Sequence, residues 1–348
     1  MLWMCGLGVW ALLIVLHLIW GSSSEIRFGA SDVFRGVGAL LGIGDPLEGH
    51  LQAIFELRLW RALVAGGVGA SLALAGALLQ GLFRNGLASP GIIGASSGAT
   101  LGVACAILVV SGYGPDLVLR STSPFAPYLI TVAAFIGAFG AVVLALVLSS
   151  SGGRVSVPTL LLVGVALNAT FGGIFVALQS IRIDDWGVSK AMLSWTFGIL
   201  EDRQAYHAAM VGVGLAVAAG CIPFVATELD LFAGGEADAR RLGVHTARIQ
   251  LVVIGAAALA TSCSVAAAGA IGFVGLVVPH VARHWVGRGH RDLLPVSACG
   301  GAVLLLGLDL IQLKVTGRRA LPPGVVMSLL GGPFFLYLLL KGRKGGEL

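Results

Sequence analysis

The stretch GAIGFVGLVVPHVARHW, residues 269–285, is apolar up to Pro279 and His280 and then turns basic. Its first half carries Gly272 and Gly275, and the proline that follows cannot donate a backbone hydrogen bond. The segment directly follows another apolar run and is short for a transmembrane helix, which needs roughly 20 apolar residues. We therefore expect a short helix that lies nearly end to end with the span before it.

The rest of the chain has the composition of a membrane protein. Its 348 residues are 57% hydrophobic and 11% charged, with a mean hydropathy of +0.95, whereas soluble domains carry roughly 25% charged residues. Because backbone polar groups find no water in hydrocarbon, the spans must be helices. The sequence predicts an all-α polytopic membrane protein with about ten transmembrane helices, in a single transmembrane domain over residues 1–348. The expected spans are 2–20, 61–82, 91–111, 127–148, 159–180, 205–225, 248–270, 272–286, 295–315 and 324–340.

Charge and cysteine patterns argue against several classes of function. The 22 lysines and arginines divide evenly between the two sides of the expected topology, so the positive-inside rule gives no orientation. They are spread among loops, and the net charge of +5 needs no nucleic-acid partner. The five cysteines form no C-x-x-C pair and are expected to be small apolar residues. The first cation is Arg27, which predicts an uncleaved N-terminal anchor rather than a signal peptide.

Two polar connections interrupt the apolar runs. Residues 21–57 form a long loop of mixed charge, and residues 226–247, ATELDLFAGGEADARRLGVHTA, form a charged insertion on the opposite side. Within the insertion, EADARRLGV has the pattern of a short amphipathic helix. A solvated loop and a helix that docks into a partner both fit this pattern.

Three features could carry chemistry. GASSG at 94–98 matches G-x-S-x-G, which would make Ser96 a nucleophile and His280 its base in an intramembrane serine protease, but the motif needs a strand-turn-helix context. His280 and His284 share a helix face without the glutamate of H-E-x-x-H, so zinc chemistry is not supported. Asp309 is the main ionisable residue inside a span and is either functional or paired with a neighbouring helix terminus.

The sequence offers no residues of its own that would couple transport to a source of energy. A proton-driven transporter would use a chain of buried carboxylates, which the expected spans do not offer. The sequence also contains no G-x-x-x-x-G-K-[ST] loop to hold ATP phosphates. If ATP drives this protein, another subunit binds the nucleotide.

Five segments together resemble the signature of one family, the FecCD-type permeases. The longest, RLWRALVAGGVGASLALAGALLQGLFRNGLASPGIIGASSGATLG (58–102), is similar to R-L-P-R-T…G-A-x-L-Q-x-x-x-x-N-P-L-A-x-P-x-x-L-G-x-x-x-G-A. The others are LLLVGVALN (160–168), EADARRLGV (236–244), GAIGFVGLVVPHVAR (269–283) and LPPGVVMSLLGGPFFLYLLLK (321–341). Trp60 and Gly86 replace prolines of the pattern, and Pro323 replaces an aliphatic residue, so local geometry can differ there.

The resemblance implies site residues at both membrane faces. Arg58 and Arg61, from R-L-x-R, are expected at the outer face, where they would help dock a binding protein. Asn85 and Leu87, from N-x-L, are expected to close the pathway at its cytoplasmic end. Residues 226–247 are expected to be the cytoplasmic coupling segment that contacts an ATPase. Its expected contact residues are Glu236, Ala237, Ala239, Arg240, Arg241, Leu242 and Gly243.

The opening stretch also has a place in this family. The chain is expected to turn at Gly272 and Gly275 and to re-enter as a short helix that contains Pro279 and His280. The carbonyl freed by the proline would be satisfied by a neighbouring helix. His280 is then a structural residue at a helix junction.

FecCD-type permeases are the membrane subunits of type II ABC importers, so the resemblance implies an ATP-driven importer of an iron chelate (siderophore or haem) or cobalamin that works by alternating access in the cell inner (plasma) membrane. The implied partners are a second copy of the chain, two ATPase subunits that bind ATP and magnesium, an extracytoplasmic substrate-binding protein and membrane lipid. The chain itself would be no enzyme and would hold no catalytic, cofactor-binding or metal-ligating residue. The alternatives are an ion-coupled secondary transporter and the intramembrane protease.

Overall fold

The computed structural model describes residues 2–21, 26–111, 125–151, 154–181, 184–316 and 321–345, and this part of the chain is almost entirely helical. A small antiparallel hairpin joins β1 (Ser150–Ser151) to β2 (Arg154–Val155). The helices are α1 (Leu2–Trp20), α2 (Ala30–Leu40), α3 (His50–Phe83), the 3-10 turn η1 (Pro90–Ile93), α4 (Ala95–Ser111), α6 (Ala126–Ser149), α7 (Val157–Ile181), α8 (Trp186–Phe197), α9 (Ala205–Phe232), α10 (Glu236–Arg241), α11 (Thr246–Ala268), α12 (Val274–Val286), α13 (His290–Thr316) and α14 (Pro323–Gly345).

The helices account for each expected span. Seven of those in the described ranges are long and apolar enough to cross a membrane: α1, α3, α6, α7, α9, α11 and α13. Two shorter apolar helices, α4 and α14, correspond to two further predicted spans. The tenth is α12, whose 13 residues extend only about 20 Å. The prediction of an all-α polytopic membrane protein is confirmed.

Helix α3 is the centre of the molecule. Its apolar window is 94% buried, and it packs against α13, α11, α9, α12 and α1. Close approach depends on glycine, because a Cβ at Gly69 would collide with the Gly301 carbonyl and a Cβ at Gly76 with the Gly275 carbonyl. Helices α4 and α6 cross in the same way where Gly98 meets Gly137. Such small-residue crossings are how helices associate where lipid is as apolar as leucine.

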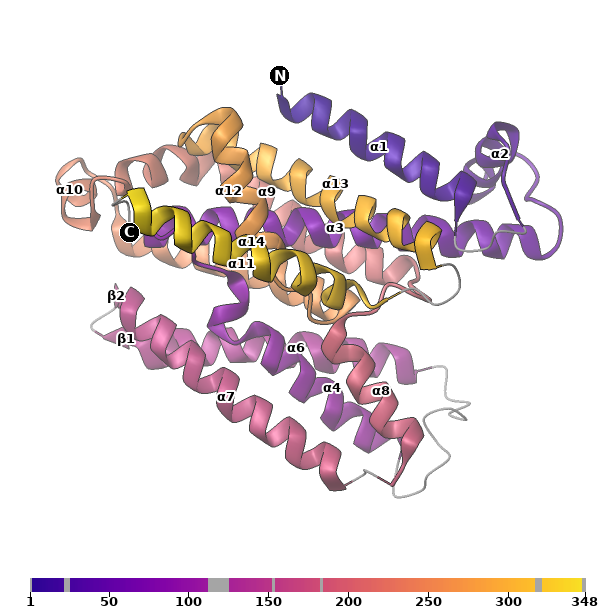
Figure 1. The fold of residues 1–348 in the computed structure, drawn as a ribbon, viewed down its shortest axis with the longest axis horizontal. Helices are drawn as coiled ribbons and strands as arrows, with labels where there is room; N and C mark the ends of the chain where they lie inside the picture. The colour runs from indigo at the N-terminus through magenta and orange to yellow at the C-terminus, as the bar shows by residue number, and fades with distance from the viewer. Residues whose placement is uncertain are drawn as a thin grey trace.

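The helices fall into two groups (Figure 1). One contains α1, α3, α9 and α11 to α14, and the other contains α4, α6, α7 and α8. Contacts of α11 with α4 and α6 join the groups, and the chain passes between them through residues 84–94. One end of the molecule carries α10 and the opposite end carries α2 (Figure 1); these are called the α10 end and the α2 end below.

Shorter helices and helix ends differ from the sequence prediction. Helix α3 begins at His50, and α2 lies inside the predicted 21–57 loop, where Gly36 packs on the Phe55 ring. Helix α8 was not expected; it is capped by Asp185, whose carboxylate accepts from the Val188 amide at 3.2 Å. Helix α9 continues to Phe232, into the predicted insertion. A search for long apolar runs overlooks short amphipathic helices and charged helix ends.

Candidate functional site

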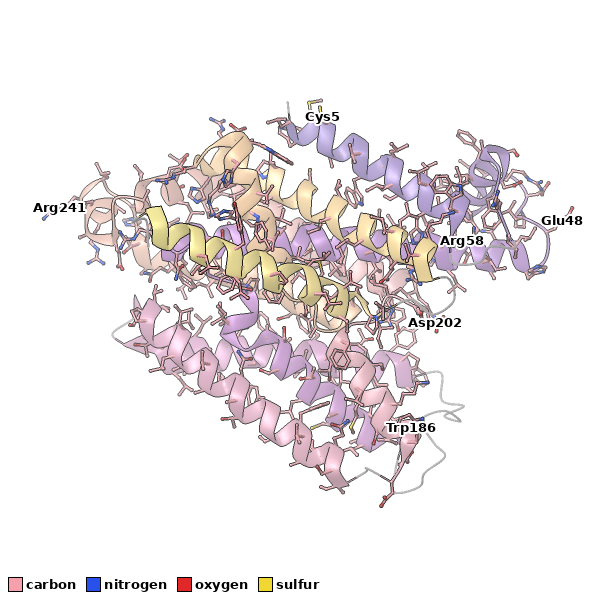
Figure 2. The ribbon with its side chains drawn as sticks, viewed as in Figure 1. Cys5, Glu48, Arg58, Trp186, Asp202 and Arg241 are labelled. Carbon is pink, nitrogen blue, oxygen red and sulfur yellow. The ribbon has the colours of Figure 1, made fainter. Side chains whose placement is uncertain are left out.

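The coupling segment predicted at 226–247 contains a short helix, α10, at the end of the molecule. Gly235 and Gly243 flank it with φ of +118° and +92°, values that a side chain disfavours. Glu236 anchors it, accepting from Arg240 at 2.8 Å and from Gln250 of α11 at 3.4 Å. The predicted helix in EADARRLGV is confirmed, and Figure 2 shows Arg241 projecting at the α10 end.

The two faces of α10 differ. Ala239 is fully buried in the main apolar cluster of the chain, whereas the Leu242 side chain is 65% exposed. Ala237, Arg240, Arg241 and Gly243 are also exposed. Ala239 therefore cannot lie in a contact surface for another subunit as predicted, because its own helices cover it. Of the predicted contact residues, those open to a partner are Ala237, Arg240, Arg241, Leu242 and Gly243.

The predicted gate residues lie in a tight turn between α3 and η1. Arg84 ends α3 in the left-handed conformation at φ +49°, and the Leu87 amide donates to the Asn85 side chain at 2.9 Å. Asn85 is exposed and Leu87 is half-buried. Nothing lies within 4 Å of a Cβ placed on Gly86, so that departure from the family pattern leaves the turn intact.

Gln80 and Asn168 fasten this connection at its two ends, and the sequence analysis did not single them out. Gln80 of α3 donates to the Ala88 carbonyl at 3.3 Å and to the Gly275 carbonyl at 3.0 Å. Asn168 of α7 donates to the carbonyls of Gly91 and Ile92, each at 3.2 Å. The available signal was an amide side chain within each apolar span, since such residues in membrane helices usually have a partner.

The helix junction differs in detail from the prediction. Pro279 and His280 lie inside the short helix α12, as expected. The residues with positive φ are Gly269, at +74°, and Phe273, at +66°, and not Gly272. Gly275 is needed for contact, because a Cβ there would lie 2.6 Å from the carbonyl oxygen of Leu72.

His280 and Pro279 have structural surroundings. The His280 ring meets the Phe334 ring of α14 edge to face, at 6.1 Å between centroids. Pro279 has no N–H for the carbonyl of Gly275, four residues before it. The bond from Gln80 takes the place of that missing donor, so the expectation that a neighbouring helix satisfies the freed carbonyl is confirmed.

The arginines predicted to dock a binding protein are buried instead. Arg58 is 3% exposed and donates to the carbonyls of Leu18 and Ile26, both at 2.9 Å. Arg61 is 8% exposed and forms a two-pronged ion pair with Asp309, at 2.9 and 2.8 Å. The predicted exposure is wrong, because partners distant in sequence hold both guanidinium groups inside the chain. Figure 2 shows Arg58 near the α2 end, close to where α1 ends.

Asp309 is the acceptor at the centre of this buried cluster. His17 of α1 contributes Nε2 at 3.1 Å and Gln312 contributes its amide at 2.9 Å, beside the two bonds from Arg61. Asp309 thus pairs with side chains from three helices rather than with a helix terminus. The cluster ties α1, α3 and α13 together near the α2 end.

A third arginine on the α2 side is also buried. Arg203 is 8% exposed and donates to the Ala267 carbonyl at 2.7 Å and to the Glu201 carbonyl at 2.9 Å. Burial lowers the pKa of its guanidinium below the usual value. These three arginines therefore serve the fold. The side chains of Arg154, Lys341, Arg343 and Lys344 lie outside those that the structure describes.

The proposed protease pair is not brought together by the fold. Ser96 lies in α4, which packs on α6 and α7. His280 lies in α12, which packs on α3, α13 and α14. The two residues belong to different helix groups, and an intramembrane serine protease has no support from this geometry.

The described helices form a multi-pass membrane bundle that carries the short helix α10 at one end. The chain belongs to the FecCD transport family, whose model matches residues 9–341. It is the permease subunit of an ABC transporter and is not itself catalytic; nucleotide binding lies on the ATPase partner.

Individual relatives are similar over most of their length. The cobalamin import system permease protein BtuC of Halobacterium salinarum is 37% identical, over 86% of this chain and 76% of the relative. The hemin transport system permease protein HmuU of Yersinia pestis is 38% identical, over 83% of each chain. A solved structure, an inward-facing conformation of a putative metal-chelate type ABC transporter, has a TM-score of 0.75 at 29% identity and covers 97% of this chain and 99% of its own.

Proposed function

We propose that this permease imports an iron chelate, haem or cobalamin across the cytoplasmic membrane by alternating access. The observation that carries the cargo class is the similarity to permeases named for cobalamin and for hemin import, at 37% and 38% identity. These cargoes are bulky chelates, which suit a largely apolar path with a steric closure better than a narrow charged filter.

The assembly we propose has two copies of the chain, two ATPase subunits and an extracytoplasmic binding protein. Residues 1–348 form a single permease domain in it. The α10 end faces the cytoplasm in this assembly, because α10 lies in the segment that resembles the family's ATPase-coupling segment and presents the exposed Leu242 and arginines there. The α2 end then faces outward, and surfaces other than Arg58 and Arg61 dock the binding protein.

The cargo is tested with the binding protein that works with this chain. Purified binding protein is titrated separately with a ferric siderophore, haemin and cobalamin, and we expect tight binding of one of the three. The same cargo should be the one that the reconstituted transporter takes up. Binding of none of these, together with tight binding of a small uncomplexed ion, would contradict the proposed cargo class.

The gate that we propose is the turn at Asn85 and Leu87, which closes the cytoplasmic end of a pathway between the two copies. With the five native cysteines replaced by alanine, Leu87→Cys is expected to cross-link the two copies in the closed state and to block import until a reductant is added. The half-buried position of Leu87 leaves it available for such a contact. Cross-linking that fails in every nucleotide state of an intact dimer would rule out this gate.

A further inference from the structure

One buried side chain connects the proposed gate to the re-entrant helix. Gln80 is 2% exposed and uses both halves of its amide. Its nitrogen donates to the carbonyl of Ala88 in the gate turn and to the carbonyl of Gly275 at the start of α12. Its oxygen accepts from Arg283 near the end of α12, at 2.6 Å. One residue of α3 therefore holds the backbone of the gate turn, the backbone at the start of α12 and a side chain near the end of α12.

The position of this amide is fixed by its surroundings. Gly76, one turn before Gln80 on α3, touches the backbone of Gly275, so the two helices cross without side chains between them. Pro279 leaves the Gly275 carbonyl without its helical donor, and Gln80 supplies one. A charged donor such as Arg283 makes the stronger kind of hydrogen bond. It also orients the amide so that its nitrogen faces the two carbonyls.

The far end of α12 leads to the coupling segment. After the turn at Gly287, His290 begins α13 and contacts the Asp230 carboxylate through its ring nitrogen at 2.6 Å and its backbone amide at 2.9 Å. Asp230 lies in the last turn of α9, directly before α10. A displacement of α10 is thus connected through α9 and the start of α13 to α12, and from α12 through Gln80 to the gate turn.

We propose that Gln80 and Arg283 are positioning residues that clamp the Asn85–Ala88 turn to α12, so that the gate follows the movement of α12 during the ATPase cycle. This inference rests on the proposed gate. In this clamp the Gln80 amide nitrogen donates to the two carbonyls, and the Gln80 amide oxygen accepts from Arg283. Substitutions can change the donor without removing the acceptor.

Substitutions at Gln80 separate the donor from the acceptor. Gln80→Glu keeps an acceptor for Arg283 but replaces the donor to Ala88 and Gly275 by a carboxylate oxygen that both carbonyls repel. Gln80→Leu removes all three bonds. Gln312→Leu is the matched control, because Gln312 is also a buried glutamine, in α13 near the α2 end. Arg283→Gln, at a half-buried position, weakens the clamp from its edge and serves if the Gln80 variants do not fold.

The experiment measures import, ATPase activity and Leu87→Cys cross-linking in proteoliposomes with the ATPase and binding protein. We expect Gln80→Glu and Gln80→Leu to lower import about tenfold or more, because both lose the bonds to the Ala88 and Gly275 carbonyls and leave buried carbonyl groups without a donor. ATPase activity should persist, and cross-linking should no longer change with nucleotide. Gln312→Leu should keep both import and the nucleotide response.

Two results would overturn the inference, and they are distinguishable. If folded Gln80 variants, or Arg283→Gln in their place, import at the unaltered rate and keep nucleotide-dependent cross-linking, the clamp is wrong while the gate stands. If Leu87→Cys in the cysteine-free background, with Gln80 and Arg283 unchanged, never cross-links, the proposed gate is wrong and the clamp has no gate to hold.

Discussion

Asp309→Ala is expected to destabilise the protein by about 3–5 kcal/mol, the usual cost of leaving a buried charge without its partner. Arg61 would keep its guanidinium buried, and His17 and Gln312 would lose their common acceptor. The measurement is the unfolding of the purified chain in detergent micelles, followed by the loss of helical signal.

The double variant Arg61→Met with Asp309→Leu is the control for this prediction. Replacing a buried pair by apolar residues of similar volume is often close to neutral, so the double variant should be more stable than Asp309→Ala. A double variant as unstable as the single one would show that the cluster acts through packing and not through its charge.

Leu242→Glu is expected to disconnect the permease from its ATPase. Leu242 directly follows α10 and is a large apolar side chain that is 65% exposed, and the few residues that dominate an interface cost about 2 kcal/mol or more when they are truncated. Placing a carboxylate there should reduce co-purification of the ATPase and abolish import, while the chain stays folded. Ala239 would be a poor choice for this test, because a charge at that buried position disturbs the chain itself.

The control for Leu242 is Leu41→Glu, at a leucine that is 70% exposed near the α2 end. Leu41→Glu makes the same change at the end that we propose faces outward, so this variant should retain the ATPase. If Leu242→Glu also co-purifies with the ATPase and imports normally, α10 does not bind the ATPase through this face.

The sequence predicted those features that depend on local composition. Long apolar runs indicated the spans, and an amphipathic pattern indicated α10. Pro279 in a short segment indicated α12 and a neighbouring helix that satisfies the Gly275 carbonyl, although not that Gln80 would be the donor. These inferences need only hydropathy, turn chemistry and backbone hydrogen bonding.

Features that depend on distant partners could not be predicted in this way. Arg61 seemed a surface cation because its partner, Asp309, is 248 residues further along the chain. Ala239 seemed part of a contact surface because a six-residue helix gives too little pattern to show which side its neighbours cover. Both errors concern which face of a correctly predicted helix is buried.

A measurement of what drives uptake is the most direct test of the central claim, that this chain is the permease of an ATP-driven importer. The chain is reconstituted in proteoliposomes with its ATPase, with the binding protein and its bound cargo on the outside. We predict uptake that requires ATP and magnesium on the α10 side and that continues when proton and sodium gradients are collapsed. Uptake driven by an ion gradient in vesicles that lack the ATPase would contradict the account and would show a secondary transporter.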